Sequence, residues 1–221
     1  MASSFISTGS AALDSLLGGG VRAGFVTDVY GESGSGKSQL CFTLCANCVK
    51  AGGSVIFIDT AGTFRPERIS EIAGRGALDK ITFIRALNSE DQIGALNRAK
   101  EMDAQLLIVD TLTSLFSAEY AGPARHLAVM SHLRDLAVYA IDSGCAVVVT
   151  NMVRNAPADD GPAAVQREYL GSSVSIYSHA KIRLGIENPA KGAFNATIVQ
   201  PPAGSTPFSI TTAGISDRAS A

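Results

Sequence analysis

The segment Gly31–Ser38 limits what this chain can fold into more than any other, because it reads G-E-S-G-S-G-K-S. It follows a strand-like run, Val26–Tyr30, and precedes residues with the spacing of a helix. Glycines let the backbone turn tightly with its N–H groups pointing inward, and the first turn of a helix carries a partial positive charge. The pattern therefore predicts a loop that holds the phosphates of a nucleotide.

Further side chains complete the predicted phosphate site. Lys37 should reach the β- and γ-phosphates of a nucleoside triphosphate, and the Ser38 hydroxyl should bind Mg²⁺. The second group on the metal side should be an acid at the end of another buried strand, and Asp110 follows the apolar residues 106–109. The alternative for Asp110 is an ordinary solvated carboxylate at a strand end.

Strand-like and helical segments alternate along most of the chain. The strand-like runs are Val26–Tyr30, Val55–Asp59, Ile81–Arg85, Leu106–Asp110 and Ala146–Thr150, and segments of helical length lie near 37–51, 66–75, 89–102 and 124–143. Apolar runs separated by helices predict a mostly parallel sheet with helices on both faces. Nearer the carboxyl end, segments 173–186, 194–199 and 206–212 predict antiparallel strands. The fold class is therefore α/β with a β-rich carboxyl end, and 221 residues fit one domain.

The segment 124–143 also predicts which side of its helix is apolar. Leu127, Met130, Arg134, Ala137 and Ile141 recur every three or four residues. This spacing predicts that they share one mostly apolar face of the helix.

The balance of charges argues against a broad surface for nucleic acids. The chain has 18 Lys and Arg against 20 Asp and Glu, a formal net charge of −2, whereas proteins that rely on phosphate contacts are usually basic. Any DNA contact would therefore have to come from a local patch. No apolar run approaches the length of a membrane-spanning helix, and the amino terminus lacks a secretory pattern, so we expect an intracellular protein.

Three of the four cysteines form a C-x3-C-x2-C pattern, which is also the spacing of a radical-SAM iron–sulfur site. Cys41, Cys45 and Cys48 fall, however, on one face of the helix that follows the phosphate loop. A helix cannot place three thiolates around one cluster without unwinding, so we expect these side chains to pack in the core. The three histidines of the chain have no metal-binding spacing, and we assign them no chemistry.

Segments along most of the chain resemble the RecA-like recombinases, in particular the archaeal RadA/RadB branch and its eukaryotic paralogues. These segments are Ile6–Gly9, Leu16–Gly20, Gly31–Leu40, Ile58–Thr60, Gly62–Arg68, Asp110–Thr111, Ala118–Tyr120, Val149–Asn151 and Phe208–Thr211. The resemblance implies the fold of a RecA-type P-loop NTPase core. It also implies a single ATP-binding domain over 1–221, without the family's amino-terminal helical DNA-binding domain. A bare core of this length is similar to RadB. Asp59–Gly62 also matches the D-T-A-G of small GTPases, but the sequence has no N-K-x-D motif for guanine.

The resemblance also implies roles for individual residues. The nucleotide-binding positions are Gly31, Glu32, Ser33, Gly34, Ser35, Gly36, Lys37, Ser38, Gln39 and Arg68, with Ser38 and Asp110 for Mg²⁺ and Asn151 as the sensor on the γ-phosphate side. Arg68 would lie over the adenine ring, because a guanidinium plane stacks on aromatic faces. A surface salt bridge from Arg68 to Glu71 or Glu67 is the alternative.

Two departures from the family pattern indicate weak hydrolysis. Ala61 stands where the family normally has the glutamate that activates the attacking water, and a methyl group cannot accept a proton. Met152 stands where a glutamine usually links the γ-phosphate to the second DNA loop, and a thioether cannot make that relay. Because the binding groups are kept and the hydrolytic group is missing, we assign no catalytic residue.

In the family, two loops at the mouth of the sheet hold DNA. The first loop corresponds to 118–126 and is shorter than in the RadA pattern, and the second corresponds to 152–172. Their candidate DNA contacts are Arg125, Arg154, Arg167 and Tyr169. Tyr169 could stack on a base. Acids in the second loop, Asp159, Asp160 and Glu168, offset its arginines, so DNA binding should be modest. The alternative is a mobile loop with ordinary solvated charges.

We therefore expect a RadB-like recombinase paralogue that binds ATP and Mg²⁺, hydrolyses ATP slowly at most, and contacts single-stranded DNA. Its partner would be a RadA-type recombinase or another recombination protein. We expect the protein in the cytoplasm of a prokaryote, in particular an archaeon, and not at a membrane. Two other functions remain open. One is a nucleotide-gated adaptor that binds a protein and little DNA, and the other is a KaiC-like regulatory ATPase on the same fold.

Overall fold

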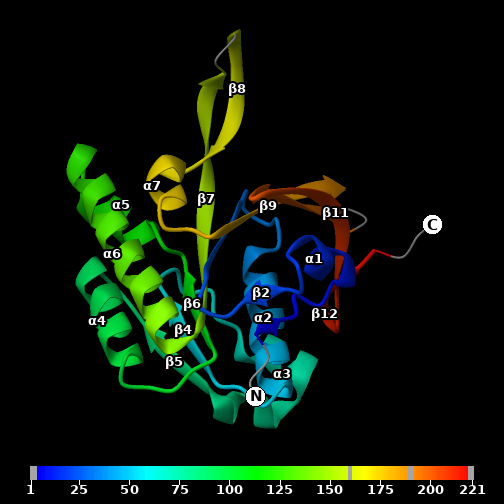
Figure 1. Ribbon diagram of the computed structural model, residues 1–221. Helices are drawn as coiled ribbons and strands as arrows, with labels where there is room; N and C mark the ends of the chain where they lie inside the picture. Colours follow the sequence, from blue (N-terminus) through cyan, green and yellow to red (C-terminus); the bar gives the residue numbers. More distant parts are fainter. Residues whose placement is uncertain (1–3, 159–160, 189–191, 219–221) are drawn as a thin grey trace.

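A ten-stranded sheet forms the centre of the computed structural model, which describes residues 4–158, 161–188 and 192–218. Its strands follow the order β12-β11-β10-β9-β3-β7-β6-β4-β5, and β8 pairs with β7 outside this path (Figure 1). The bounds are β3 (Val26–Gly31), β4 (Val55–Asp59), β5 (Ile81–Arg85), β6 (Leu106–Asp110), β7 (Ala146–Ala158), β8 (Gly161–Glu168), β9 (Ala180–Asn188), β10 (Ala193–Gln200), β11 (Pro202–Thr211) and β12 (Gly214–Asp217). A separate two-stranded sheet pairs β1 (Phe5–Ile6) with β2 (Val21–Arg22).

The centre of the sheet is parallel, as the sequence predicts. From β9 through β3, β7, β6 and β4 to β5, each strand pairs with its neighbour in parallel register. The predicted bounds of β4, β5 and β6 agree with the structure, and β3 extends one residue further, to Gly31. Because parallel strands end at the same edge, the phosphate loop and Asp110 meet there.

The carboxyl-terminal prediction is partly wrong. Strands β9 to β12 pair antiparallel with one another, but β9 also pairs in parallel with β3 and so continues the central sheet. Residues 173–175, predicted as strand, belong instead to a short helix, α7 (Gly171–Ser175). In that helix Val174 is buried in the same hydrophobic cluster as residues of α6. The β-rich composition of the segment does not reveal this tertiary contact.

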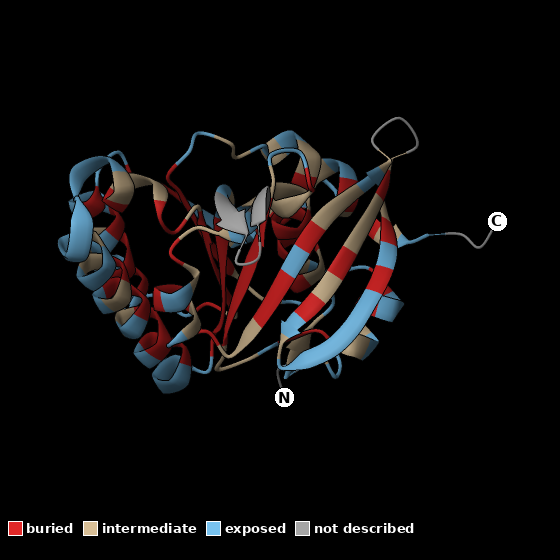
Figure 2. Cartoon of the chain, turned by 90° about the horizontal axis from the view of Figure 1, so that it is seen from above, coloured by how far each residue is buried: buried red, intermediate tan, exposed pale blue. Residues whose placement is uncertain are grey.

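Helices cover the two faces of the sheet. The bounds are α1 (Ala11–Leu16), α2 (Lys37–Lys50), α3 (Pro66–Ala73), η1 (Arg75–Lys80), α4 (Ser89–Ala99), α5 (Ser114–Glu119) and α6 (Gly122–Ser143). Alternate residues of β6 serve the two sides, because Leu106 and Ile108 pack with α2, whereas Leu107 and Val109 pack with α4 and α6. The buried residues lie in the central strands and on the inner sides of the helices (Figure 2).

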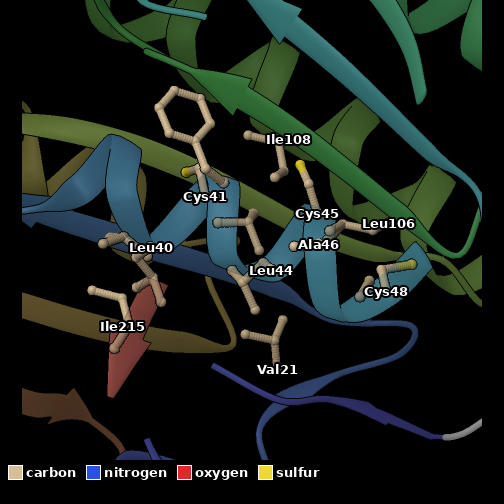
Figure 3. Packing of buried hydrophobic residues seen from close by; sticks show 14 of the residues in the cluster. Val21, Leu40, Cys41, Leu44, Cys45, Ala46, Cys48, Leu106, Ile108 and Ile215 are labelled. Carbon is tan, nitrogen blue, oxygen red and sulfur yellow. The ribbon is translucent and has the colours of Figure 1, made fainter. Parts of the chain in front are cut away.

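The three cysteines of α2 pack in the core, as the sequence predicts. Cys41, Cys45 and Cys48 lie among apolar side chains such as Leu44 and Ile108 (Figure 3). Burial raises the pKa of the Cys48 thiol to about 11, so it remains protonated at neutral pH. Within the described ranges, no three His, Cys, Asp or Glu side chains are grouped so that they could hold a metal ion.

The apolar face predicted for 124–143 is not the side of the helix that packs on the sheet. Leu127 is 67% exposed and Ile141 is 64% exposed on α6. The side that packs on the sheet instead includes Val129, Leu133 and Leu136. Both sides of the helix carry apolar residues, so spacing alone could not decide which one meets the sheet. In the part of the chain that the structure describes, no helix is long and apolar enough to span a membrane.

Strand β7 is longer than predicted and forms a hairpin with β8. The sequence predicts a strand over Ala146–Thr150, but β7 continues to Ala158 and pairs antiparallel with β8. Figure 1 shows the two strands rising together beyond the rest of the molecule. We call residues 152–158 and 161–168 the arm. Asp159 and Asp160, which the sequence analysis counted as loop acids, lie outside the described residues.

Candidate nucleotide-binding site

The loop 31–36 has the backbone that a phosphate cradle needs. Strand β3 ends at Gly31, and Gly36, with φ 96°, caps the amino terminus of the 14-residue helix α2. A Cβ on Gly31 would lie 2.3 Å from the carbonyl oxygen of Leu184 and 2.7 Å from Ser35 Oγ. Only glycine fits this position, so the neighbouring strand β9 sets the width of the loop.

Lys37 lies folded over the loop. Its ammonium donates to the carbonyl oxygens of Gly31 and Glu32, each at 2.8 Å. Partial burial lowers the pKa of Lys37 from its ordinary value, and the negative charge of Asp110 opposes that shift. An ammonium held by neutral carbonyl oxygens is ready to exchange them for the stronger acceptors of a phosphate group.

The hydroxyls around Asp110 form the metal side of the site. Ser38 Oγ donates to Asp110 Oδ2 at 2.8 Å, and Thr63 Oγ1 donates to the same oxygen at 3.2 Å. The other oxygen, Oδ1, accepts from Thr150. The side chain of Asp110 is only 2% exposed, so the alternative of a solvated carboxylate is wrong. Hydroxyl and carboxylate oxygens are ligands that suit Mg²⁺.

A tight turn places Ala61 in the wall of the site. The Asp59 carboxylate accepts from the N–H groups of Ala61 at 3.0 Å, Gly62 at 2.7 Å and Thr63 at 3.2 Å. Arg85 lies 3.0 Å from the same carboxylate and balances its charge. Asp59 is therefore a structural residue of the turn, and the side chain that it presents at position 61 is a methyl group.

These residues surround one cavity of about 640 Å³ at the carboxyl edge of the sheet. It brings together nine of the predicted residues: Gly31, Glu32, Ser33, Gly34, Gly36, Lys37, Ser38, Gln39 and Asp110. Ala61 and Met152 also line it, as do Thr63, Val153, Asn155, Gln166 and Ile210, which the sequence analysis did not assign. The arm thus forms part of the cavity wall. Thr63 lies within a segment that carries the family resemblance, which could have identified it.

Arg68 lies next to this cavity but does not line it. Its Nε donates to Gln39 Oε1 at 2.9 Å, and its guanidinium also binds the carbonyl oxygens of Thr211 and Thr212. The alternative from the sequence, a salt bridge to Glu71, is present at 2.7 Å. Arg68 thereby joins α2 and α3 to the turn between β11 and β12. The stacking of Arg68 on adenine stays a prediction.

Asn151 is entirely buried and lies outside the cavity lining. Its Oδ1 accepts from Thr113 Oγ1 at 2.8 Å, and its Nδ2 donates to Glu168 Oε1 at 3.1 Å and to the Tyr169 carbonyl at 2.7 Å. Its neighbour Met152 faces the cavity with its side chain 39% exposed. The amide of Asn151 therefore joins strands rather than pointing at the phosphates, and its sensor role stays a prediction.

The four candidate DNA contacts gather at the base of the arm. Arg125 donates to the Tyr169 hydroxyl at 2.7 Å, and the Arg154 guanidinium lies 5.7 Å from the centre of the Tyr169 ring. Arg154 and Arg167 are cross-strand partners in the β7–β8 hairpin. Three arginines and one aromatic ring therefore share a small basic surface, although the chain as a whole is slightly acidic.

Two details of the DNA loops differ from the sequence analysis. The first loop is nearly absent, because α5 ends at Glu119 and α6 begins at Gly122. In the second, Glu168 does not lie beside the arginines as an offsetting charge, because its carboxylate binds the buried Lys181. Arg167 and Glu168 are successive residues of β8, so their side chains point to opposite sides of the strand, a separation that counting charges cannot detect.

Comparison with known proteins agrees with the family resemblance found in the sequence. A family model described as Rad51 matches residues 3–218. The DNA repair protein RAD51 of Mycosarcoma maydis is 42% identical over 168 residues, which are 67% of this chain and 50% of that protein. The DNA repair and recombination protein RadA of Cenarchaeum symbiosum is 41% identical over 172 residues, 69% of this chain and 43% of that protein. RAD51 of Saccharomyces cerevisiae is 36% identical over 204 residues, 82% of this chain and 50% of that protein. The chain thus spans about half the length of these relatives.

Proposed function

The chain belongs to the Rad51 family, and from this premise we propose that it is a RadB-like paralogue that binds ATP with Mg²⁺ and acts in DNA recombination or repair. The observation that carries the proposal is the cavity that joins Lys37, Ser38 and Asp110 to the base of the arm. In this proposal, nucleotide binding controls the arm and through it the contact with DNA or with a recombinase partner.

The residues of the cavity fit a triphosphate and its metal. Lys37 and the N–H groups of the loop would hold the phosphates, while Ser38 and Asp110 would hold Mg²⁺. The ion, when bound, supplies charge neutralisation at the β- and γ-phosphates. The fit is supported by Gly31, where any side chain would collide with Leu184, and by the hydroxyls already directed at Asp110.

Hydrolysis in this proposal is slow. Ala61 lines the cavity on the turn that Asp59 holds, and it offers no group that could orient or deprotonate a water molecule. Loss of a general base commonly reduces a chemical step by about 10²- to 10⁴-fold. Met152 offers no hydrogen bond that would report the γ-phosphate to the arm. Binding without rapid turnover suits a regulatory paralogue.

The test measures ATP turnover and binding of single-stranded DNA on the same preparation, with Lys37→Ala and with the exposed Lys50→Ala at the far end of α2 as the matched control. We expect slow turnover, DNA binding that strengthens with ATP and weakens with salt, and loss of the ATP effect in Lys37→Ala alone. Vigorous turnover would contradict the slow-hydrolysis part. Equal behaviour of the two lysine variants would contradict the site.

The net charge of −2 favours a second candidate, a nucleotide-gated adaptor that binds a protein and little DNA. The same salt titration separates the two. Absence of DNA binding at low salt with ATP, together with intact ATP binding, would leave the adaptor function. The single-domain organisation and the archaeal cytoplasmic location stay predictions, since the similar proteins come from fungi and plants as well as from an archaeon.

A further inference from the structure

Three ionisable side chains meet in the interior beneath the arm, and burial together with the nearby Glu168 raises the pKa of Asp28 well above its ordinary value. Asp28 of β3 is fully buried, Lys181 of β9 is 3% exposed, and the side chain of Glu168, at the end of β8, is 9% exposed. The Lys181 ammonium lies 3.4 Å from Asp28 Oδ2, donates to Glu168 Oε2 and donates to Ser175 Oγ at 2.8 Å. None of these residues lines the nucleotide cavity. The arm is thus tied at its base to two strands of the central sheet.

Because burying the Lys181 ammonium costs solvation energy, its pairing with Glu168 favours one position of β8. Charged groups lose solvation when they are buried, and they are tolerated where an opposite charge and hydrogen bonds compensate them. Lys181 compensates Glu168 directly, and Asn151 donates to the other oxygen of the same carboxylate at 3.1 Å. If β8 moved away, Lys181 would lose its closest anion. The buried ammonium therefore favours the position of β8 in which Glu168 points inward.

The inward position of Glu168 determines where its neighbours point. Successive side chains of a strand lie on opposite faces, so Arg167 and Tyr169 face away from Lys181. Arg154, the cross-strand partner of Arg167, lies over the Tyr169 ring on that same outer side. A shift of one residue in the β7–β8 register would reverse this arrangement and turn the arginines inward.

A set of polar contacts runs from the Asp28–Lys181–Glu168 cluster, which we call the lock, toward the cavity. Asp28 lies in the strand that runs into the phosphate loop, and Lys181 connects it to Glu168. Glu168 accepts from Asn151, whose amide oxygen accepts from Thr113, three residues after Asp110. The base of the arm is thus connected through Lys181 to Asp28 of β3, and through Asn151 to Thr113 in the turn that follows β6.

We propose that Glu168 is a positioning residue, whose pairing with buried Lys181 sets the register of the arm and turns Arg154, Arg167 and Tyr169 outward toward single-stranded DNA. The inference rests on the proposed DNA contact and adds a residue that acts through the arm instead of touching DNA.

The test compares Glu168→Gln with Glu187→Gln. Both variants remove one negative charge, but Glu187 is 42% exposed and pairs with Arg218 at the surface, far along β9 from the lock. Three quantities are measured: hydrogen exchange of the arm amides without ligands, affinity for single-stranded DNA at low salt, and affinity for ATP. Exchange without ligands tests the lock even if the chain binds no DNA, which would be a failure of the proposed function alone.

We expect Glu168→Gln to raise arm exchange and lower DNA affinity by about tenfold each, because a hydrogen bond to a charged group is lost, while ATP affinity stays unchanged. The fall in DNA affinity has the opposite sign from the effect of removing a negative charge, which on its own strengthens DNA binding. Unchanged arm exchange would overturn the proposal, and so would an equal rise in DNA affinity in both variants. If Glu168→Gln does not fold, Glu168→Asp keeps the charge and should show the same changes in smaller measure; no change in arm exchange there would overturn the proposal.

Discussion

Because His132 is buried, we predict that the folded protein loses stability in mild acid. This side chain of α6 is 2% exposed, and its ring lies 5.4 Å from the Phe116 ring of α5. Neither ring nitrogen has a hydrogen-bond partner among the described residues. Burial lowers the pKa of His132 from 6.5 to about 4, because the charged form would lose its solvation in the apolar layer.

The direction of the pH effect follows from proton binding at His132 in the folded and in the unfolded chain. Between pH 4 and 6.5 the unfolded chain binds a proton at His132 that the folded chain does not, so the free energy of unfolding rises with pH in this window. The contribution is fully present above 6.5 and is lost as pH falls below that value. With pKa values of about 4 and 6.5, the loss between pH 8 and pH 5 is about 2 kcal/mol.

Urea unfolding at pH 8 and at pH 5 measures this loss, with His132→Leu as the comparison. Leucine has a similar volume and no proton to bind, so the contributions of all other titrating groups cancel in the difference between the two proteins. We expect the unaltered chain to lose about 2 kcal/mol more than the variant. An equal loss in both proteins would refute the assignment of a buried neutral imidazole.

Three further predictions concern the site and the arm. Ala61→Glu should raise ATP turnover by about 10²-fold or more without changing ATP affinity, measured by phosphate release; no gain, or the same gain with Ala61→Gln, would contradict the missing-base explanation. Gly31→Ala should lower the free energy of unfolding by about 1–3 kcal/mol in urea titration through collision with Leu184, while Gly185→Ala, which meets open space, should not; equal effects would refute the steric argument. Arg154→Ala should reduce the slope of log affinity against log salt for single-stranded DNA by about 0.7, and an unchanged slope would exclude a phosphate contact at this residue.

The elements that local pattern specifies were predicted well. Strands β4, β5 and β6 are short apolar runs bounded by polar residues, and their limits agree with the structure. The phosphate loop was found because its glycines, lysine and serine follow one another without interruption. Here the sequence pattern and the tertiary structure depend on the same few neighbouring residues, so no distant contact was needed to predict them.

The parts that were missed depend on contacts between distant residues. The arm reads as a loop because prolines and glycines interrupt it, and only the antiparallel pairing of residues 153–158 with 161–168 makes it a hairpin. Arg68 binds carbonyl oxygens 143 and 144 residues away, a contact that no local spacing indicates. Lys181 and Asp28 were unremarkable in sequence, because their pairing depends on how β3 and β9 lie side by side.

Calorimetric titration of ATP in the presence and absence of Mg²⁺ tests whether the cavity at Lys37 and Asp110 is a nucleotide site. We expect saturable binding that requires the ion, is lost in Lys37→Ala and is kept in Lys50→Ala, with no more than slow release of phosphate during the titration. Absence of any binding heat with Mg²⁺ at millimolar ATP, or binding that survives Lys37→Ala, would contradict the assignment of the cavity as a nucleotide site.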